Sequence, residues 1–299
     1  MNLYAPKYYK NFGCIADKCT HSCCVGWEID VDDVTLEKYK NCSDCYANGI
    51  QESIDFDDIP HFRLGEGERC PHLNEKGLCK IILSLGEDYL CDICREHPRF
   101  YHDTIRGKEV GLGMACEEAC RLILNSDDYR EMVVIGEVDD DDDVIEFDTL
   151  SHRAHTYSLL SDRSVPYLER LRAICRTYHI SLDIHSDDAW RELLASLEYL
   201  DEEHKALFSC YSSSFSVAAE LEKPLERALA YFIYRHCSSA LDESEFRTAL
   251  GFSLFCERLL ASVAHAEKGK NMVELARILS EEIEYSEENT ETIKMQFLF

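Results

Sequence analysis

The stretch CIADKCTHSCCVGW, from Cys14 to Trp27, places four cysteines within eleven residues. Two further cysteine motifs follow it, CPHLNEKGLC at residues 70–79 and CDICREHPR at residues 91–99. Of the chain's 16 cysteines, twelve lie in the first 120 residues, where glycines and prolines interrupt each candidate helix or strand. Such a segment is typical of a fold stabilised by bound metal in place of a large core. The sequence therefore predicts a metal-binding N-terminal part.

The cysteine count alone leaves the identity of the metal open. Iron–sulfur clusters and structural zinc sites both use four thiolates. Zinc sites usually contain paired Cys-x2-Cys units, which Cys42 with Cys45 and Cys91 with Cys94 could supply. Because the first cluster is irregular, we expect an iron–sulfur cluster, and we keep zinc as the alternative metal and reduced structural thiols as the third interpretation.

The compartment expected for this chain also favours metal over disulfides. Residues 1–14 contain no apolar segment of the secretory type, so we expect a cytoplasmic protein, in which disulfides do not normally persist. The cysteines beyond residue 120 lie in apolar surroundings and are interpreted as small buried hydrophobic residues. They are Cys175, Cys210, Cys237 and Cys256.

Residue periodicity predicts a mostly α fold in which a cysteine-rich N-terminal part with short strands precedes a helical bundle. The predicted division is a metal-cluster domain at 1–138, an acidic junction at 139–149 that begins with the five aspartates Asp139 to Asp143, and an α-helical domain at 150–299. Short strands are expected at Trp27–Val31 and Lys108–Met114, and a helix near Leu78–Leu90. Later helices are expected behind Pro166, behind a cap at Ser186 or Asp187, from Pro224 in the first turn to His236, and at Glu245–Ala264 and Met272–Ile283.

Composition excludes two classes of partner. The 299 residues include 31 Lys plus Arg and 58 Asp plus Glu, a net charge of −27, so the clustered positive charge that holds a phosphate backbone is missing and nucleic acid is not expected. The apolar run Ala228–Tyr234 has seven residues, too few to cross a membrane, so no membrane partner is expected.

Taken together, the motifs resemble the flagellin lysine-N-methylase family. The residues that carry the resemblance are Tyr9–Cys14 (YKNFGC), Cys19, Cys23–Ile29 (CCVGWEI), Cys70–Cys79, Leu85–Leu90 (LGEDYL), Cys94–Arg99, Cys116, Tyr231–Arg235 (YFIYR) and Ser286–Asn289 (SEEN). The resemblance implies a bacterial methyltransferase that methylates lysine side chains of flagellin or a similar surface-filament protein. It also implies S-adenosylmethionine as methyl donor and an iron–sulfur cluster, of the four-iron type, on some of the shared cysteines.

Eight cysteines match the family pattern, which is more than one four-iron cluster needs, so the ligands stay open among Cys14, Cys19, Cys23, Cys24, Cys70, Cys79, Cys94 and Cys116. Further cysteines are additions of this chain, and they leave a second metal site conceivable: Cys42, Cys45, Cys91 and Cys120. His72 and His97 depart from the family pattern, and a hydrogen-bonded or solvated histidine is preferred over a metal ligand at both positions.

Two arginines are candidates for the donor site. Pro98 is expected to end a helix and to turn Arg95 and Arg99 toward the cysteines. There a guanidinium could offset thiolate charge or bind the carboxylate of the donor in a two-pronged contact. A surface salt bridge is the competing interpretation.

The sequence also leaves a non-enzymatic alternative. Gly111-Leu112-Gly113 lacks the third glycine of a dinucleotide-type loop, and the Cys-x3-Cys-x2-Cys spacing of radical enzymes fails because its third position falls on Gly26. The alternative is a non-catalytic metal-binding protein, with iron–sulfur or zinc, whose helical half docks a partner.

Overall fold

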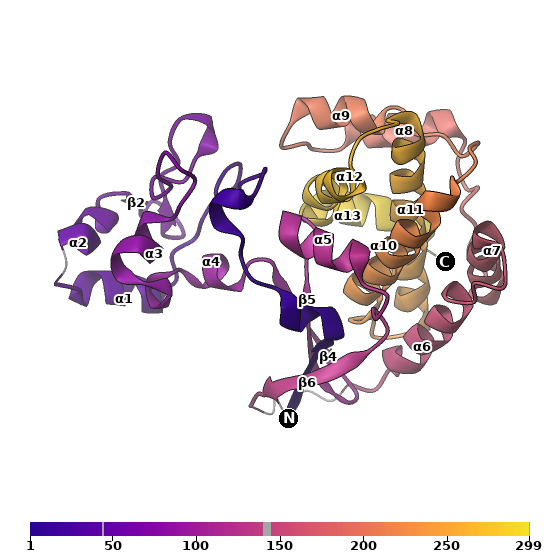
Figure 1. The fold of residues 1–299 in the computed structure, drawn as a ribbon, viewed down its shortest axis with the longest axis horizontal. Helices are drawn as coiled ribbons and strands as arrows, with labels where there is room; N and C mark the ends of the chain where they lie inside the picture. Colours follow the sequence, from indigo (N-terminus) through magenta and orange to yellow (C-terminus); the bar gives the residue numbers. More distant parts are fainter. Residues whose placement is uncertain (44, 140–144, 299) are drawn as a thin grey trace. The chain divides into compact units, whose positions relative to one another are not determined.

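The computed structural model describes residues 1–43, 45–139 and 145–298 and confirms a mostly α fold (Figure 1). The strands are β1 Asn2–Pro6, β2 Ile54–Asp55, β3 His61–Phe62, β4 Arg99–Thr104, β5 Gly107–Leu112 and β6 Met132–Glu137. The α-helices are α1 Asp33–Asn41, α2 Cys45–Gln51, α3 Lys80–Leu85, α4 Asp92–Glu96, α5 Glu117–Asn125, α6 Thr149–Leu160, α7 Tyr167–Thr177, α8 Asp187–Ser196, α9 Glu202–Phe208, α10 Ala219–Cys237, α11 Glu243–Ala266, α12 Met272–Leu279 and α13 Glu287–Lys294.

The chain forms two compact units. Gly13–Pro98 is the first, which we call the cysteine-rich unit. Met1–Phe12 and Arg99–Phe299 together form the second, the sheet-and-helix unit. The junction expected from sequence at 139–149 falls within the second unit, and the domain bounds built on it stay a prediction. Of its aspartates, those at positions 140–143 lie outside the described residues.

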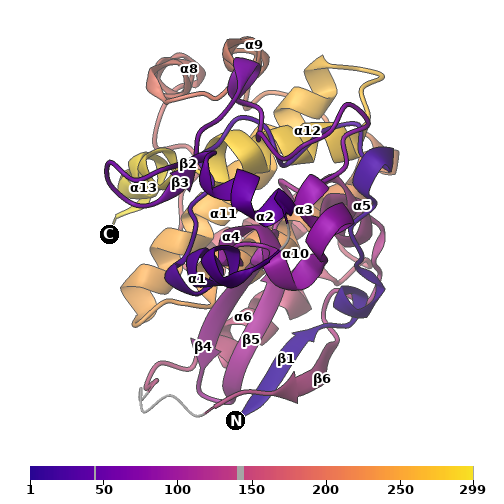
Figure 2. The ribbon, with the colours of Figure 1, turned by 90° about the vertical axis from the view of Figure 1, so that its left-hand side faces the viewer.

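A four-stranded sheet in the order β4-β5-β1-β6 organises the sheet-and-helix unit. The N-terminal strand β1 is parallel to β5, with Leu3 opposite Lys108, and antiparallel to β6. Figure 2 shows the four strands next to one another with α6 and α10 behind them. The ring of Phe100 on β4 packs against Tyr234 of α10 with 5.5 Å between ring centroids, which fixes this helix on the sheet.

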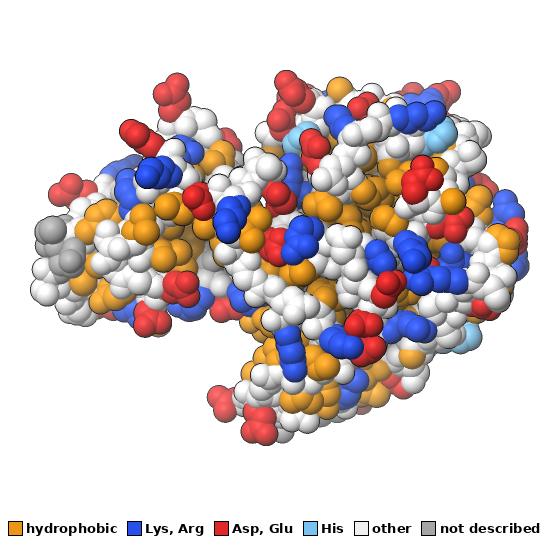
Figure 3. Space-filling model, viewed as in Figure 1, with side chains coloured by type: hydrophobic (Ala, Val, Ile, Leu, Met, Phe, Trp, Pro, Cys, Tyr) orange, Lys and Arg blue, Asp and Glu red, His pale blue; other side chains and the backbone are white. Residues whose placement is uncertain are grey.

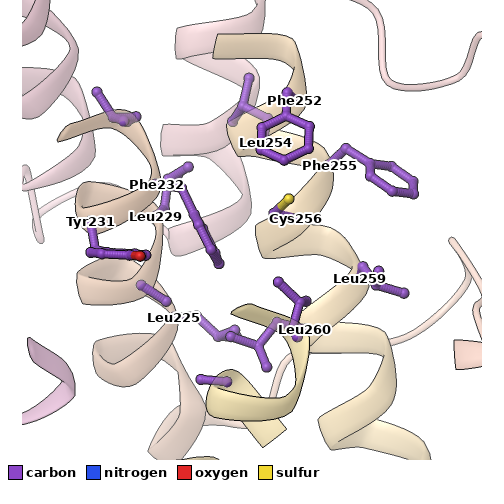
Figure 4. Close-up of a cluster of buried hydrophobic side chains, with 14 of the residues drawn as sticks. Leu225, Leu229, Tyr231, Phe232, Phe252, Leu254, Phe255, Cys256, Leu259 and Leu260 are labelled. Atoms are coloured by element: carbon purple, nitrogen blue, oxygen red, sulfur yellow. The ribbon is translucent and has the colours of Figure 1, made fainter. Parts of the chain in front are cut away.

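The main hydrophobic core lies between α10 and α11 and the helices around them. Side chains of both helices interdigitate in Figure 4, with Leu229 and Phe232 on α10 and Phe252 and Phe255 on α11. Trp190 of α8 stacks on Phe255 with 4.1 Å between ring centroids. Full burial of such a side chain contributes about 1.5–3 kcal/mol, so this cluster dominates the stability of the unit.

The helical periodicity after residue 150 is confirmed. α7 begins directly behind Pro166, and the Ser186 side chain accepts a hydrogen bond from the first turn of α8, as expected for an N-cap. α11 covers the helix predicted at Glu245–Ala264. The helix predicted at Met272–Ile283 is α12 followed by a π-helical turn, and β5 covers most of the predicted strand at Lys108–Met114.

Three expected elements differ from the structure. Trp27–Val31 is not a strand, because Gly26 takes a φ of +90° and only the isolated bridges of Val25 and Asp30 form there. The helix expected at Leu78–Leu90 is interrupted at Gly86, whose φ of +94° ends α3 and leaves a short 3-10 turn. α10 begins at Ala219, so Pro224 lies in its second turn and not in the first.

The cysteines beyond residue 120 behave as the sequence predicts. Cys237 and Cys256 are fully buried in the main core, and burial raises the pKa of both thiols. Cys175 and Cys210 are half-buried against the same core. Cys120 of α5 is buried as well, and its thiol donates to the Val273 carbonyl at 3.4 Å.

Charged side chains of both signs share the surface. On the face of the sheet-and-helix unit in Figure 3, Lys and Arg side chains are interspersed with Asp and Glu. Within the described residues, no helix is both long and apolar enough to cross a bilayer.

Candidate metal centre

Eight cysteines line a single cavity of about 310 Å³ in the cysteine-rich unit, which we call the thiol cavity. Together they come from three separate parts of the sequence: Cys14, Cys19, Cys23, Cys24, Cys70, Cys79, Cys91 and Cys94. Cys70 and Cys91 are buried, whereas Cys14 and Cys23 are exposed, so the cavity has a closed inner wall and an open outer rim.

The first cysteine motif reaches the second through backbone pairing. The amide of Cys70 donates to the carbonyl of Cys24 at 2.9 Å, and Val25 forms an antiparallel bridge with Arg69. Gly26 has a φ of +90°, a conformation that favours glycine, and turns the chain directly after this bridge. The Trp27 indole then donates to the carbonyl of Cys23 at 2.5 Å, which fixes the rim.

A tight turn places Cys70 and Cys79 on the same cavity wall. The side-chain oxygen of Asn74 accepts hydrogen bonds from the amides of Lys76 and Leu78, at 2.8 and 3.0 Å. Gly77 supplies the φ of +75° that closes this turn. The turn thereby returns the chain to Cys79, the residue that precedes α3.

Cys91 and Cys94 are positioned by α4. Cys91 is the N-cap residue, and Cys94 lies one helical turn later on the same face. Asp32 ties the start of α4 to α1, because one of its oxygens accepts from the Asp92 amide and the other caps α1. Tyr39 of α1 lies against the pair, with its hydroxyl 3.7 Å from the Cys91 sulfur.

In two pairs of neighbouring cysteines, a hydrogen bond between the side chains lowers the pKa of one thiol. A hydrogen bond from Cys23 lowers the pKa of Cys24 to about 7, and burial acts in the opposite direction. The hydrogen bond with Cys94 lowers the pKa of Cys91, while it raises that of Cys94. Burial raises the pKa of Cys70 to about 11. Metal ligation requires thiolates, and the surroundings of Cys24 and Cys91 favour that form.

His72 is hydrogen-bonded, one of the two roles that the sequence analysis preferred to metal ligation. Its Nδ1 lies 2.9 Å from the Tyr46 hydroxyl and its Nε2 lies 2.9 Å from the Ser53 hydroxyl. Both ring nitrogens are therefore engaged, and burial lowers the pKa of His72 to about 4. The ring also packs edge-on against Phe62, so it acts as a fixed support below the turn between Cys70 and Cys79.

The structure brings together seven of the eight family-matched cysteines and adds Cys91 to them. The exception is Cys116, which belongs to the sheet-and-helix unit as the N-cap residue of α5. Cys42 follows α1 and does not line the cavity, and the side chain of Cys45 lies outside what the structure describes. The spacing of Cys91 and Cys94 is the sequence signal that pointed to the additional thiol.

The two candidate arginines of the donor site lie in different units. α4 ends at Glu96, before Pro98, as expected. The Arg95 side chain is exposed on α4 and pairs with Asp92. Arg99 begins β4, and its Nε donates to the Tyr9 hydroxyl at 2.8 Å. Neither arginine lines the thiol cavity.

The thiol cavity suits a multi-atom cluster. A volume of about 310 Å³ is far larger than the roughly 10–15 Å³ that a single water molecule needs. A structural zinc ion lies about 2.3 Å from each sulfur and its closed site leaves little free space. The four thiolates of an iron–sulfur cluster can be drawn from the eight present, and the remainder can hold the rim together.

Comparison with known proteins identifies relatives over part of the chain. No family model and no solved structure matches the chain. It is 31% identical over 130 residues to the flagellar biosynthetic protein FliU of Salmonella muenchen, a match that covers 41% of this chain and 77% of that protein. The lysine-N-methylases of Salmonella choleraesuis and Salmonella typhimurium are also 31% identical over 130 residues, but the match covers only 32% of their length, so this chain spans about a third of them. The extent of the match to FliU shows that the chain belongs to the flagellin lysine-N-methylase family.

Proposed function

We propose that this protein is an S-adenosylmethionine-dependent protein lysine N-methyltransferase that acts on flagellin or a similar surface-filament protein. We propose in addition that thiolates of the thiol cavity bind an iron–sulfur cluster. The relatives named lysine-N-methylase support the reaction, and the relative named as a flagellar biosynthetic protein supports a flagellar substrate.

One observation supports the cofactor proposal, namely that eight cysteines from three parts of the sequence line one cavity. The cluster ligands are best sought on the inner wall, where five thiols lie close enough to affect one another's pKa. They are Cys24, Cys70, Cys79, Cys91 and Cys94. When bound, the cluster would supply a centre that either transfers electrons or holds the unit together. Arg69, whose charge favours the Cys24 thiolate, offsets part of the negative charge that the ligands would bring.

Methyl transfer sets its own requirements on the protein. The donor would supply an electrophilic methyl group, and the chain must hold the lysine as a neutral amine in line with it. Arg99 remains our candidate for binding the donor carboxylate. Its guanidinium lies 5.7 Å from the centre of the Phe12 ring. A planar guanidinium can bind a carboxylate through two nitrogens, which a lysine cannot do. Arg95 is the weaker candidate because Asp92 and Glu96 both pair with it.

The acidity of the chain fits a cationic substrate surface. A net charge of −27 attracts lysine-rich faces and raises the rate of encounter without setting specificity. We therefore expect the affinity for flagellin to fall as the salt concentration rises. An affinity that does not change with salt would assign the charge to solubility.

The test is transfer of a labelled methyl group from S-adenosylmethionine to purified flagellin by anaerobically purified protein. We expect label on flagellin lysines with the parent protein and loss of label with Cys24→Ser, while Cys42→Ser keeps the activity because Cys42 lies outside the cavity. Arg99→Lys should retain iron and lose methyl transfer. A protein that holds iron but transfers no methyl group would instead be the non-catalytic metal-binding protein.

A further inference from the structure

A second cavity of about 360 Å³ lies in the sheet-and-helix unit and shares no residue with the thiol cavity. Its volume falls in the range of small-molecule sites. Five tyrosines from four different elements or connections contribute to its wall: Tyr8, Tyr129, Tyr157, Tyr231 and Tyr234. All five are buried, so the ring surfaces form a shielded apolar wall. We call it the tyrosine–arginine cavity.

Four arginines complete the wall, Arg106, Arg130, Arg153 and Arg227, and among its described lining residues there is no carboxylate. This is unusual in a chain in which acids outnumber Lys and Arg by almost two to one. Arg153 and Arg106 share the one carboxylate of Glu109, at 2.7 and 2.6 Å. Arg227 pairs with Asp127 at 2.8 Å, so four guanidiniums face two carboxylates and the wall keeps an excess of positive charge.

The arginine at the inner wall is rigid. Arg153 contacts Glu109 through both terminal nitrogens, at 2.7 and 2.9 Å, and donates to the Ser238 hydroxyl at 2.6 Å. Its guanidinium also lies 5.0 Å from the centre of the Tyr234 ring. A positive group that is fixed in this way needs no reorganisation when an anion enters.

Two buried donors of the wall have no hydrogen-bond partner within the described part of the chain. They are the hydroxyl of Tyr234 and Nε of Arg227, and both residues are more than nine-tenths buried. An unsatisfied buried donor costs about 1–3 kcal/mol, so an acceptor for either group would stabilise the protein. Both groups call for an acceptor.

We propose that the tyrosine–arginine cavity binds a small anion that carries a flat ring. Arg130 at the rim can bind a carboxylate or phosphate, and the positive charge of Arg153 and Arg227, whose terminal nitrogens already bond protein groups, adds to the attraction. An aromatic or purine ring matches the flat tyrosine walls. The proposal rests on this cavity alone and holds whether or not the protein is a methyltransferase. Two sources share this chemistry, a nucleoside amino acid such as the methyl donor and a nucleoside monophosphate.

Isothermal titration of the full chain with S-adenosylhomocysteine and, separately, with adenosine 5′-monophosphate tests the proposal. The first variant is Ala154→Trp, which fills the cavity from the exposed face of α6. Its control is Ser158→Trp, at an exposed position of the same helix that does not line the cavity. The second variant is Arg130→Glu at the rim, with the exposed Arg172→Glu as control for the same change in net charge.

We expect one of the two probes to bind saturably with one site per chain. Ala154→Trp should weaken that binding by at least about tenfold and Arg130→Glu by several-fold, while both controls bind as the parent does. Binding of S-adenosylhomocysteine would place the donor here and would remove Arg99, which does not line this cavity, from the donor site. Binding of the monophosphate alone would make the cavity a nucleotide site. If neither probe binds the folded protein, or if Ala154→Trp binds as tightly as the parent, the proposal is overturned.

Discussion

Replacing Glu257 with glutamine should stabilise the protein at alkaline pH and have little effect under acid conditions. Glu257 lies on α11, is 2% exposed and accepts a hydrogen bond from the Tyr167 hydroxyl at 2.7 Å. Burial raises its pKa from 4.5 to about 7, against the opposing effects of that hydrogen bond and of Arg258. The folded protein therefore prefers the protonated carboxyl, which glutamine resembles in shape and charge.

The raised pKa of Glu257 sets both the direction and the size of the change in unfolding free energy with pH. Because the pKa is raised in the folded state, the stability that Glu257 contributes is complete below about pH 4.5 and is lost as the pH rises through about 7. The gap between 4.5 and about 7 corresponds to about 3 kcal/mol, at about 1.4 kcal/mol for each pH unit. About 2 kcal/mol of this falls between pH 5.5 and 8. Glutamine does not titrate, so the variant avoids this loss.

The measurement is urea unfolding of both proteins at pH 5.5 and pH 8, followed by helical circular dichroism. The lower pH keeps the protein clear of its isoelectric point of about 4.7. Other titrating groups are common to both proteins and cancel in the comparison. The variant should gain about 2 kcal/mol over the parent between the two conditions. An equal difference at both pH values would refute the reasoning, and so would a loss at pH 8.

Other predictions concern packing, capping and the support of the thiol cavity. Gly111→Ala should lower the unfolding free energy by about 1–3 kcal/mol, because the added carbon would lie 2.7 Å from the Tyr234 ring. The control Gly136→Ala places its carbon within 4 Å of no atom, so thermal unfolding of this variant should be close to that of the parent. Ser186→Ala removes the cap of α8 and should cost about 1 kcal/mol in urea unfolding, and an unchanged midpoint would contradict the cap. His72→Phe forfeits the hydrogen bonds to two hydroxyls and should lower the urea midpoint by the equivalent of about 1–3 kcal/mol; a variant as stable as the parent would show that the ring is not a support.

The sequence predicted those features that depend on local chemistry. Cysteine spacing identified residues that line the thiol cavity, since Cys23, Cys24, Cys70 and Cys79 stand in short motifs with turn residues beside them. Helical periodicity and caps identified the later helices, because a cap such as Ser186 acts within one turn of its own position. The histidine at position 72 was interpreted correctly as hydrogen-bonded.

Features that depend on distant partners could not be predicted in the same way. β1 joins a sheet whose other strands come about 100 residues later, and nothing within Asn2–Pro6 signals that pairing. The spacing of Cys91 and Cys94 is visible in the sequence, but the contact of Tyr39 with Cys91 spans 52 residues and is not. The tyrosine–arginine cavity escaped the sequence analysis for the same reason, because Tyr8 and Arg153 share no motif and meet only in the folded unit.

Metal analysis of the anaerobically purified full chain shows whether the thiol cavity binds an iron–sulfur cluster. Iron, acid-labile sulfide and zinc are measured per chain in the parent, in Cys24→Ser and in the control Cys42→Ser. In the parent we expect iron and sulfide in equal amounts, about four of each per cluster, with absorption near 400 nm. Cys24→Ser should lose both iron and sulfide, and Cys42→Ser should retain both in full. Stoichiometric zinc without iron or sulfide in the parent would contradict the iron–sulfur proposal, and so would a Cys24→Ser variant that is folded and keeps all its iron.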